Sequence, residues 1–252
     1  MRRPRPRMAG SSFCHLLRQT QQFAASHALR PSNLQPVMRV TLATVAAAAA
    51  GDCLCIFDID RTLTGGQGSA GSPCPKDAQI DGVYDAAYAG GTLVLSEVSQ
   101  FIAQTFCSQC YIGTISAGSA SGAGSAERGV LHDKLAVPGH LPTTSWSACS
   151  PVTSPLVTAC PDGSKQNAVP GIVSWYEQNA GASIANGDVH FFDDRADNVQ
   201  PFSSTGYNAR QISCSSRDSK YGNAIGLCGA EVSEIVPDVG VQVCGGTDAL
   251  VV

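Results

Sequence analysis

A short apolar run that ends in two closely spaced carboxylates is the feature that most constrains the fold of this chain. The run covers residues 54–57, Asp58 follows it directly, and Asp60 stands two residues later. Such a run predicts a buried strand of a parallel sheet, and these sheets present their chemistry at the carboxyl ends of the strands. Where the strand turns into a loop, the second carboxylate can point away from the first. One carboxylate can then attack a substrate while the other moves protons.

Two further predicted strands end in polar side chains. Residues 110–116 end in Ser116, with Thr114 as an alternative functional hydroxyl. Residues 189–194 end in the acidic pair Asp193 and Asp194. Because the carboxyl ends of parallel strands lie at one edge of the sheet, we expect these groups close to Asp58. The sequence leaves open which member of the acidic pair contacts a metal, and it favours supporting positions for Asp197 and Asn198.

Lys165 stands at the start of a predicted helix. Pro170 indicates that the helix has barely begun there, because proline is tolerated only in a first turn. The apolar residues that follow recur at helical spacing and include Val169, Ile172, Val173 and Tyr176. The lysine is therefore expected at the mouth of the helix.

Together these four segments resemble the signature of the haloacid dehalogenase-like superfamily, an apolar strand followed by Asp-x-Asp-x-Thr. Asp58, Asp60 and Thr62 fill that pattern, and Ser116, Lys165 and the acidic pair follow in the superfamily's order. The resemblance covers most of residues 52–214. It implies an α/β fold with a doubly wound, Rossmann-like parallel sheet, helices on both faces and small insertions in place of a large cap domain.

The same residues offer the ligands of a hard cation. A carboxylate nucleophile is repelled by an anionic phosphate ester unless a cation lies between them. Asp58, with Asp193 or Asp194 and the backbone carbonyl of Asp60, supplies the oxygen ligands that Mg²⁺ prefers. We therefore expect Mg²⁺ as the cofactor.

Attack by Asp58 would form an aspartyl-phosphate, and Asp60 would protonate the leaving oxygen and then activate water. Lys165 and the hydroxyl of Ser116, or of Thr114, would hold the phosphoryl oxygens. The resemblance implies these roles for a phosphatase of phosphorylated small molecules or larger phosphoesters. Two alternatives remain open: a phosphotransferase or mutase with the same chemistry, and a catalytically silent secreted protein that uses the fold for binding or storage.

Charge separates residues 1–51 from residues 52–252. The first segment holds seven of the 16 basic residues and no acidic residue, which leaves nine basic and 20 acidic residues and a formal charge of −11 in the rest. The acidic segment is expected to form the hydrolase domain and not to bind nucleic acid. Residues 40–50 are apolar but too short to span a membrane, so residues 1–51 predict a signal peptide, with a start at Met38 as one option, or an organellar transit peptide.

Cysteine usage favours the secretory alternative. Ten of the 11 cysteines lie in residues 52–252, an even number that is typical of disulfide-bonded proteins. The spacing of Cys107 and Cys110 resembles a redox or zinc pair, but no second such pair and no nearby histidine completes a site. We therefore expect structural disulfides, whose connectivity the sequence does not determine.

The remaining elements follow from periodicity and turn composition. We expect an insertion at 65–91, a helix at 93–106, loops at 117–126 and 131–154, and short strands at 155–159 and 209–214.

Overall fold

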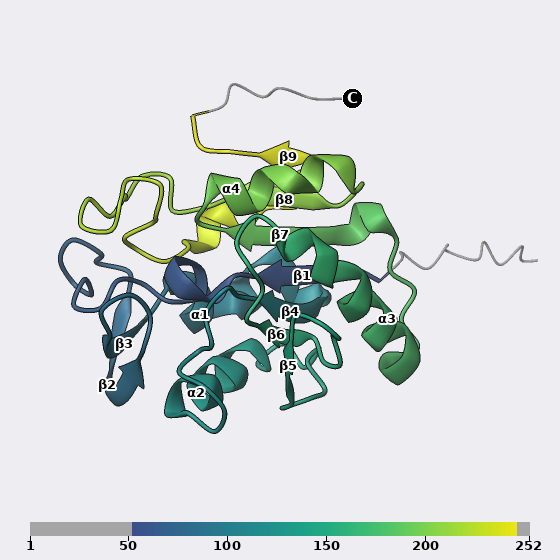
Figure 1. Ribbon diagram of the computed structural model, residues 1–252, viewed down its shortest axis with the longest axis horizontal. Helices are drawn as coiled ribbons and strands as arrows, with labels where there is room; N and C mark the ends of the chain where they lie inside the picture. Colours follow the sequence, from purple (N-terminus) through teal and green to yellow (C-terminus); the bar gives the residue numbers. More distant parts are fainter. Residues whose placement is uncertain (1–51, 246–252) are drawn as a thin grey trace, which may run out of the picture. The chain divides into compact units, whose positions relative to one another are not determined.

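The computed structural model describes residues 52–245, and its centre is a seven-stranded parallel sheet (Figure 1). β1 lies in the middle and pairs with β4 on one side and with β7 on the other. The strand order is β5-β6-β4-β1-β7-β8-β9, which confirms the predicted α/β class. The strands are β1 (Leu54–Phe57), β4 (Tyr111–Ile115), β5 (Trp146–Ala148), β6 (Leu156–Thr158), β7 (Val189–Asp193), β8 (Asn208–Gln211) and β9 (Val241–Gln242).

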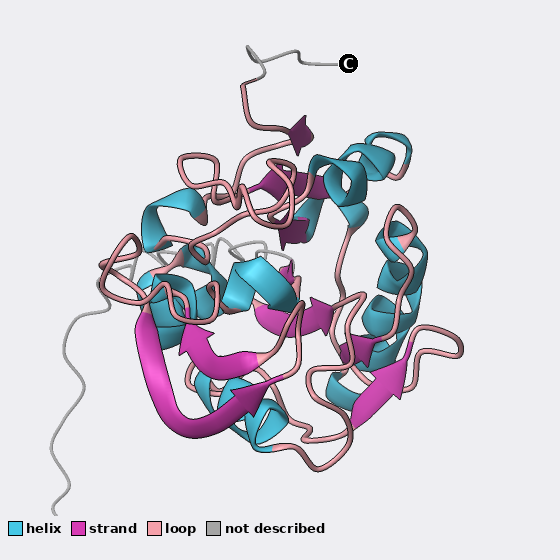
Figure 2. Ribbon diagram, turned by 60° about the vertical axis from the view of Figure 1, so that its left-hand side comes forward, coloured by secondary structure: helices cyan, strands magenta, loops and turns pink. Residues whose placement is uncertain are grey.

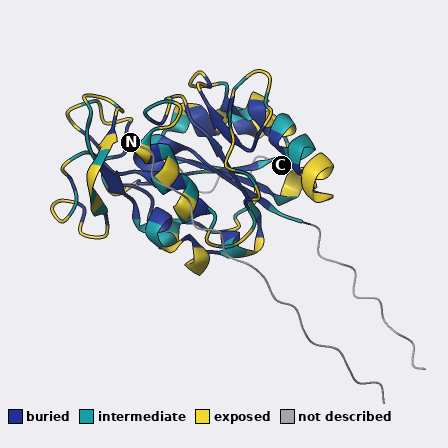
Figure 3. Cartoon of the chain, turned by 90° about the horizontal axis from the view of Figure 1, so that it is seen from below, coloured by how far each residue is buried: buried dark blue, intermediate teal, exposed yellow. Residues whose placement is uncertain are grey.

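Helices pack on both faces of this sheet because alternate residues of β1 point to opposite sides. Cys55 and Phe57 join the core under α1 and α2, whereas Leu54 and Ile56 join the core under α3 and α4. The central strands are buried, the edge strands β5 and β9 are less so, and the outer helix surfaces are exposed (Figure 3). The helices are α1 (Glu97–Phe101), α2 (Ala126–Leu135), α3 (Val169–Ala180) and α4 (Ala196–Val199).

The predicted insertion folds as an antiparallel hairpin of β2 (Ala78–Asp85) and β3 (Gly91–Leu95), separate from the main sheet (Figure 2). The predicted helix at 93–106 is therefore confirmed only in part: residues 93–95 belong to β3, and α1 ends at Phe101. Two 3₁₀ turns, Ile102–Gln104 and Phe106–Gln109, follow it. Ser96 caps the short α1 by accepting a hydrogen bond from the backbone N–H of Ser99. The apolar spacing of this segment fits a helix, but pairing with β2 determines the conformation of its first residues.

Two elements in the region predicted as loop were missed. α2 includes residues 131–135, and β5 forms the edge of the sheet within 131–154. Leu131 and Leu135 are the fully buried apolar side chains of α2, and two positions give too weak a periodicity to predict a helix from the sequence.

Other predicted elements are confirmed. β6 lies within residues 155–159, and β8 overlaps the strand predicted at 209–214. Lys165 begins a 3₁₀ turn, Lys165–Ala168, that leads directly into α3, and Pro170 occupies the first turn of that helix. Lys165 therefore lies at the N-terminal end of α3, as its position in the sequence shortly before Pro170 predicts.

Five disulfides join all ten cysteines of the described residues. Cys107 and Cys110 do not form a redox or zinc pair, because each is bonded to a cysteine beside or within β1. Such a number of disulfides is typical of extracellular and secretory-pathway proteins. The pairs are Cys53–Cys110, Cys55–Cys107, Cys74–Cys228, Cys149–Cys160 and Cys214–Cys244.

Within residues 52–245, no helix has the length and apolar character needed to cross a membrane. The predicted signal or transit peptide, residues 1–51, lies outside the described residues.

The disulfides should differ in how strongly they stabilise the protein. Cys74 and Cys228 are 154 residues apart, whereas Cys149 and Cys160 are 11 apart. Loop-closure entropy predicts that replacing the first pair by alanine costs about 2 kcal/mol more than replacing the second. Urea denaturation of the two double variants measures the difference. Equal losses in the free energy of unfolding would contradict this chain-entropy explanation.

Candidate active site

The candidate site lies at the carboxyl ends of β1 and β7, where the two following connections turn toward opposite faces of the sheet. The connection after β1 packs on one face of the sheet through Val98, and the connection after β7 packs on the other through Val199. Such a divergence opens a crevice at the carboxyl ends of the two strands. Asp58 and Asp193 lie at this point, and the backbone N–H of Asp58 donates to the carbonyl of Phe192 at 2.9 Å. The register of the sheet therefore brings the two carboxylates together.

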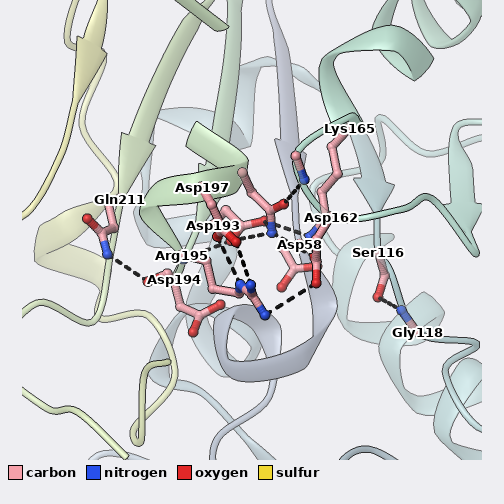
Figure 4. A network of polar contacts seen from close by, with 12 residues as sticks. Asp58, Ser116, Gly118, Asp162, Lys165, Asp193, Asp194, Arg195, Asp197 and Gln211 are labelled. Carbon is pink, nitrogen blue, oxygen red and sulfur yellow. Dashed lines mark hydrogen bonds and ion pairs between the residues drawn. The ribbon is translucent and has the colours of Figure 1, made fainter. Parts of the chain in front are cut away.

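A buried lysine bridges these carboxylates (Figure 4). The Nζ atom of Lys165 lies 2.6 Å from Oδ1 of Asp58 and 2.7 Å from Oδ2 of Asp193. Burial alone disfavours the charged lysine, but the carboxylates of Asp193 and Asp58 raise the pKa of Lys165 above its ordinary value. Burial in turn raises the pKa of Asp58, although Lys165 opposes this shift. The site therefore holds one ammonium group between two carboxylates.

Asn198 also holds the carboxylate of Asp193. Its Nδ2 atom donates to Oδ1 and Oδ2 of Asp193 at 3.2 and 3.0 Å, while its Oδ1 atom accepts from the backbone N–H of Gly163 at 2.8 Å. Asn198 thus supports an acidic residue, as the sequence predicts, and it also anchors the loop that leads to Lys165.

Asp194 completes a cluster suited to a hard cation. Its Oδ2 atom accepts from the backbone N–H of Gly226 at 2.6 Å, but its buried Oδ1 atom has no hydrogen-bond partner among residues 52–245. Oxygens of Asp58, Asp193 and Asp194 lie within 4.8 Å of one another. Burial, followed by the neighbouring Asp193, raises the pKa of Asp194 to about 8. Three buried carboxylates and one unpartnered oxygen fit a divalent cation that accepts oxygen ligands.

Asp60 points away from this cluster because the chain turns sharply after Asp58. The turn at Ile59–Leu63 places Arg61 in the left-handed region, with φ of 68°. The Oδ2 atom of Asp60 lies beside Gly118, where an added Cβ would come within 2.5 Å of it. Burial, followed by Asp85, raises the pKa of Asp60 to about 6. The side chains of Asp58 and Asp60 thus occupy different environments, as their different predicted roles require.

The two hydroxyl candidates on β4 lie at different depths. Ser116 immediately follows the strand, and its Oγ atom accepts from the backbone N–H of Gly118 at 3.1 Å. Thr114 is fully buried two residues earlier, and its hydroxyl has no hydrogen-bond partner. Neither side chain lines the cavities at the site, whereas Ala117 and Gly118, just beyond Ser116, do.

Two adjoining cavities open at the site. An inner cavity of about 60 Å³ is lined by Asp58, Lys165, Asp194 and Asn198, among others. An outer cavity of about 370 Å³ is bounded by the hairpin turn at 85–88 and the loop at 118–121. Four residues line both cavities and therefore lie where the two cavities adjoin: Asp60, Tyr88, Asp162 and Arg195.

Sequence reasoning missed three of these shared residues. Tyr88 lies in the turn between β2 and β3, and Asp162 lies in the loop before Lys165. Arg195 follows the acidic pair directly and forms ion pairs with Asp162 and Asp197. Of these three, the sequence could have indicated only Arg195, because it is a basic residue directly after an acidic strand end. Tyr88 and Asp162 lie in turns, where no periodicity marks a functional residue.

Comparisons with known proteins identify no family. No family model and no curated protein matches the chain. One solved structure with some similarity is a hypothetical protein from Xanthomonas campestris, with 18% sequence identity and a TM-score of 0.32. The match covers 63% of this chain and 64% of that one, so this chain spans less than two thirds of that protein's length. A similarity this low carries no argument about function.

Replacing Gly118 tests the position of Asp60. In Gly118→Ala the new methyl group would displace the Asp60 carboxylate, so the phosphoester hydrolysis predicted from the sequence should slow by up to about 10²-fold. The melting temperature should change little, because only the end of one side chain must move. Gly187→Ala is the matched control, since nothing lies within 4 Å of its added Cβ. An unchanged rate in Gly118→Ala would contradict this position for the acid.

Proposed function

We propose that this protein is a Mg²⁺-dependent phosphatase that hydrolyses phosphomonoesters through a phosphorylated Asp58. One observation carries the proposal: the carboxylate of Asp58, paired with the buried ammonium of Lys165, lines a small cavity that Asp60 also reaches. The resemblance of the four sequence motifs to the haloacid dehalogenase-like superfamily supports the same activity. The disulfides agree with a secreted enzyme.

The inner cavity suits the size of a phosphoryl group, and the negative charge of that group would be balanced by Lys165 together with a bound cation, because four carboxylates also line the cavity. Its volume is about 60 Å³, and Lys165 offers a cation beside the nucleophile. Ser116 does not line this cavity, so its hydroxyl would act by accepting the N–H of Gly118 and holding the loop that borders the cavities. A lysine held by two carboxylates is positioned in advance, so it stabilises developing negative charge without a reorganisation cost.

Asp58, Asp193 and Asp194 would hold Mg²⁺, and the unpartnered Oδ1 atom of Asp194 is the observation that fits it. A bound Mg²⁺ neutralises phosphate charge and so lets an anionic carboxylate approach phosphorus. Asn198 keeps Asp193 oriented, and Gly226 leaves one oxygen of Asp194 free.

Each step can be assigned to side chains. An Asp58 oxygen forms a bond to phosphorus as the bond between phosphorus and the leaving oxygen breaks, and Asp60 gives its proton to that oxygen. Asp60 is suited to this because burial holds its proton up to about pH 6. A water molecule then attacks the phosphorylated Asp58 and gives a proton to Asp60. Inorganic phosphate leaves, and both carboxyl groups return to their starting states.

Isosteric replacements distinguish the two acids. Asp58→Asn should abolish turnover, because an amide cannot take the place of the attacking carboxylate. Asp60→Asn should slow the reaction by about 10²–10⁴-fold, the usual contribution of general acid–base catalysis. Release of phosphate from a panel of phosphomonoesters measures both effects. Full activity in Asp58→Asn would exclude the mechanism, and a rate within twofold of the wild type in Asp60→Asn would exclude the acid–base role.

Removal of the metal gives an independent test. Activity should disappear with a chelator and return with Mg²⁺, and Asp194→Asn should weaken Mg²⁺ binding measured by titration calorimetry. Activity that persists after exhaustive chelation would contradict the proposal.

Metal affinity should also depend on pH in a defined direction. The pKa of Asp194 is raised to about 8, so its proton must leave when a cation binds. Mg²⁺ should therefore bind more tightly at pH 8.5 than at pH 6.5, with proton release on binding at the lower pH. Equal affinities at the two pH values would show that Asp194 is not a ligand.

A further inference from the structure

A second group of carboxylates lies on the other side of Asp60. Oxygens of Asp60, Asp85 and Glu127 lie within 4.8 Å of one another. Asp85 ends β2, and Glu127 lies in the first turn of α2, so the cluster gathers three segments that are distant in the sequence. Asp85 and Glu127 are almost completely buried.

No cationic partner compensates this cluster within residues 52–245, since none of its three members forms a salt bridge there. Asp85 accepts hydrogen bonds from the Gln67 amide at 2.6 Å and the Ala87 backbone at 2.8 Å. Glu127 accepts one from the Ser121 hydroxyl through Oε2. Its buried Oε1 atom has no hydrogen-bond partner within the described part of the chain, which is costly for a carboxylate unless a donor or cation binds there.

The outer cavity reaches two of the three carboxylates of this cluster, whereas the fully buried Glu127 does not line it. Asp60 and Asp85 line it, and Ser121, which binds Glu127, lines it as well. Arg195 is the one cationic side chain among its lining residues, and it is already paired with Asp162 and Asp197. The part of the cavity beside Asp60 is therefore acidic and open to a positively charged group.

We propose that the outer cavity binds the ammonium group of the substrate, so that the preferred substrates are phosphomonoesters of small amino alcohols. This inference rests on the proposed phosphatase function and names its substrate class. Asp60 would contact the leaving oxygen while Asp85 and Glu127 attract the ammonium group beyond it. A two-carbon chain separates the nitrogen from the alcohol oxygen by roughly 3–4 Å, from ordinary bond lengths. That span agrees with carboxylates that lie within 4.8 Å of one another.

A matched pair of substrates tests the proposal directly. Phosphoethanolamine and n-propyl phosphate have the same length, and they differ in a terminal ammonium group against a methyl group. The wild type should favour phosphoethanolamine in kcat/KM by about 10- to 100-fold, the range expected of charge-assisted hydrogen bonds in a partly buried site.

Charge-removing variants separate this preference from the different reactivities of the two esters. Glu127→Gln keeps an acceptor for Ser121 and the size of the side chain, and Asp85→Asn keeps an acceptor for Ala87. Each should reduce the ratio of the two kcat/KM values about tenfold or more, mainly through KM for phosphoethanolamine. Because Asp85 and Glu127 lie beside Asp60, any effect on that acid acts on both esters and cancels in the ratio. Asp81→Asn is the control, because Asp81 lies on the same strand, is exposed and lines neither cavity.

The outcomes distinguish this inference from the function on which it rests. Hydrolysis of both esters without an ammonium preference, or a preference unchanged in both variants, would overturn the inference and leave the phosphatase intact. Hydrolysis of neither ester, with activity on other phosphomonoesters of the panel, would overturn the inference alone, and hydrolysis of no ester of the panel would overturn both. A second tightly bound divalent cation that is lost in Glu127→Gln would also overturn the inference, because a metal would then neutralise the cluster.

Discussion

The structure depends on the bridge between the ammonium group of Lys165 and the carboxylates of Asp58 and Asp193. All three groups are withdrawn from water, and such burial is costly unless each charge is paired and hydrogen-bonded. The surrounding chain supplies this pairing: β1 and β7 bring the two acids side by side, and the turn before α3 delivers the lysine. The bridge therefore links the strand register, the helix start and the chemistry of the site.

The groups around the bridge carry more negative than positive charge, and this excess favours the binding of cationic ligands. Asp58, Asp193 and Asp194 place three carboxylates against one lysine, and one oxygen of Asp194 is unpartnered. On the far side of Asp60, Asp85 and Glu127 add two more acids without a cation. An interior with more carboxylates than cations is stabilised when cations bind, which is why we assign a metal to the first cluster and an ammonium group to the second.

Disulfides attach the segments around the site to one another and to the sheet. The Cys74–Cys228 disulfide joins the insertion to the loop that carries Gly226, and Gly226 donates to Asp194. Another pair of disulfides ties β1 to the segment just before β4. The disulfides thus restrict both the outer wall of the site and the strand that carries Asp58.

The sequence predicted the inner cluster better than the outer cavity for a physical reason. Asp58, Lys165 and the acidic pair stand at ends of strongly apolar or periodic segments, and parallel topology brings such ends together. Glu127 and Tyr88 belong to a weakly periodic helix and a tight turn, so their positions depend on tertiary packing that a linear pattern does not encode. The same limitation explains the wrong helix at 93–95, where pairing with β2 outweighs helical spacing.

The most direct test of this account is to trap the covalent intermediate. With p-nitrophenyl phosphate, whose leaving group needs no proton, the Asp60→Asn variant should still form the phosphorylated enzyme but hydrolyse it slowly. Acid quenching during turnover followed by borohydride reduction should then convert residue 58 to homoserine, detectable by peptide mass spectrometry. The account predicts this conversion at position 58 and at no other carboxylate of the site. Turnover with Asp58 unmodified, or modification at Asp193 or Asp194 in its place, would contradict it.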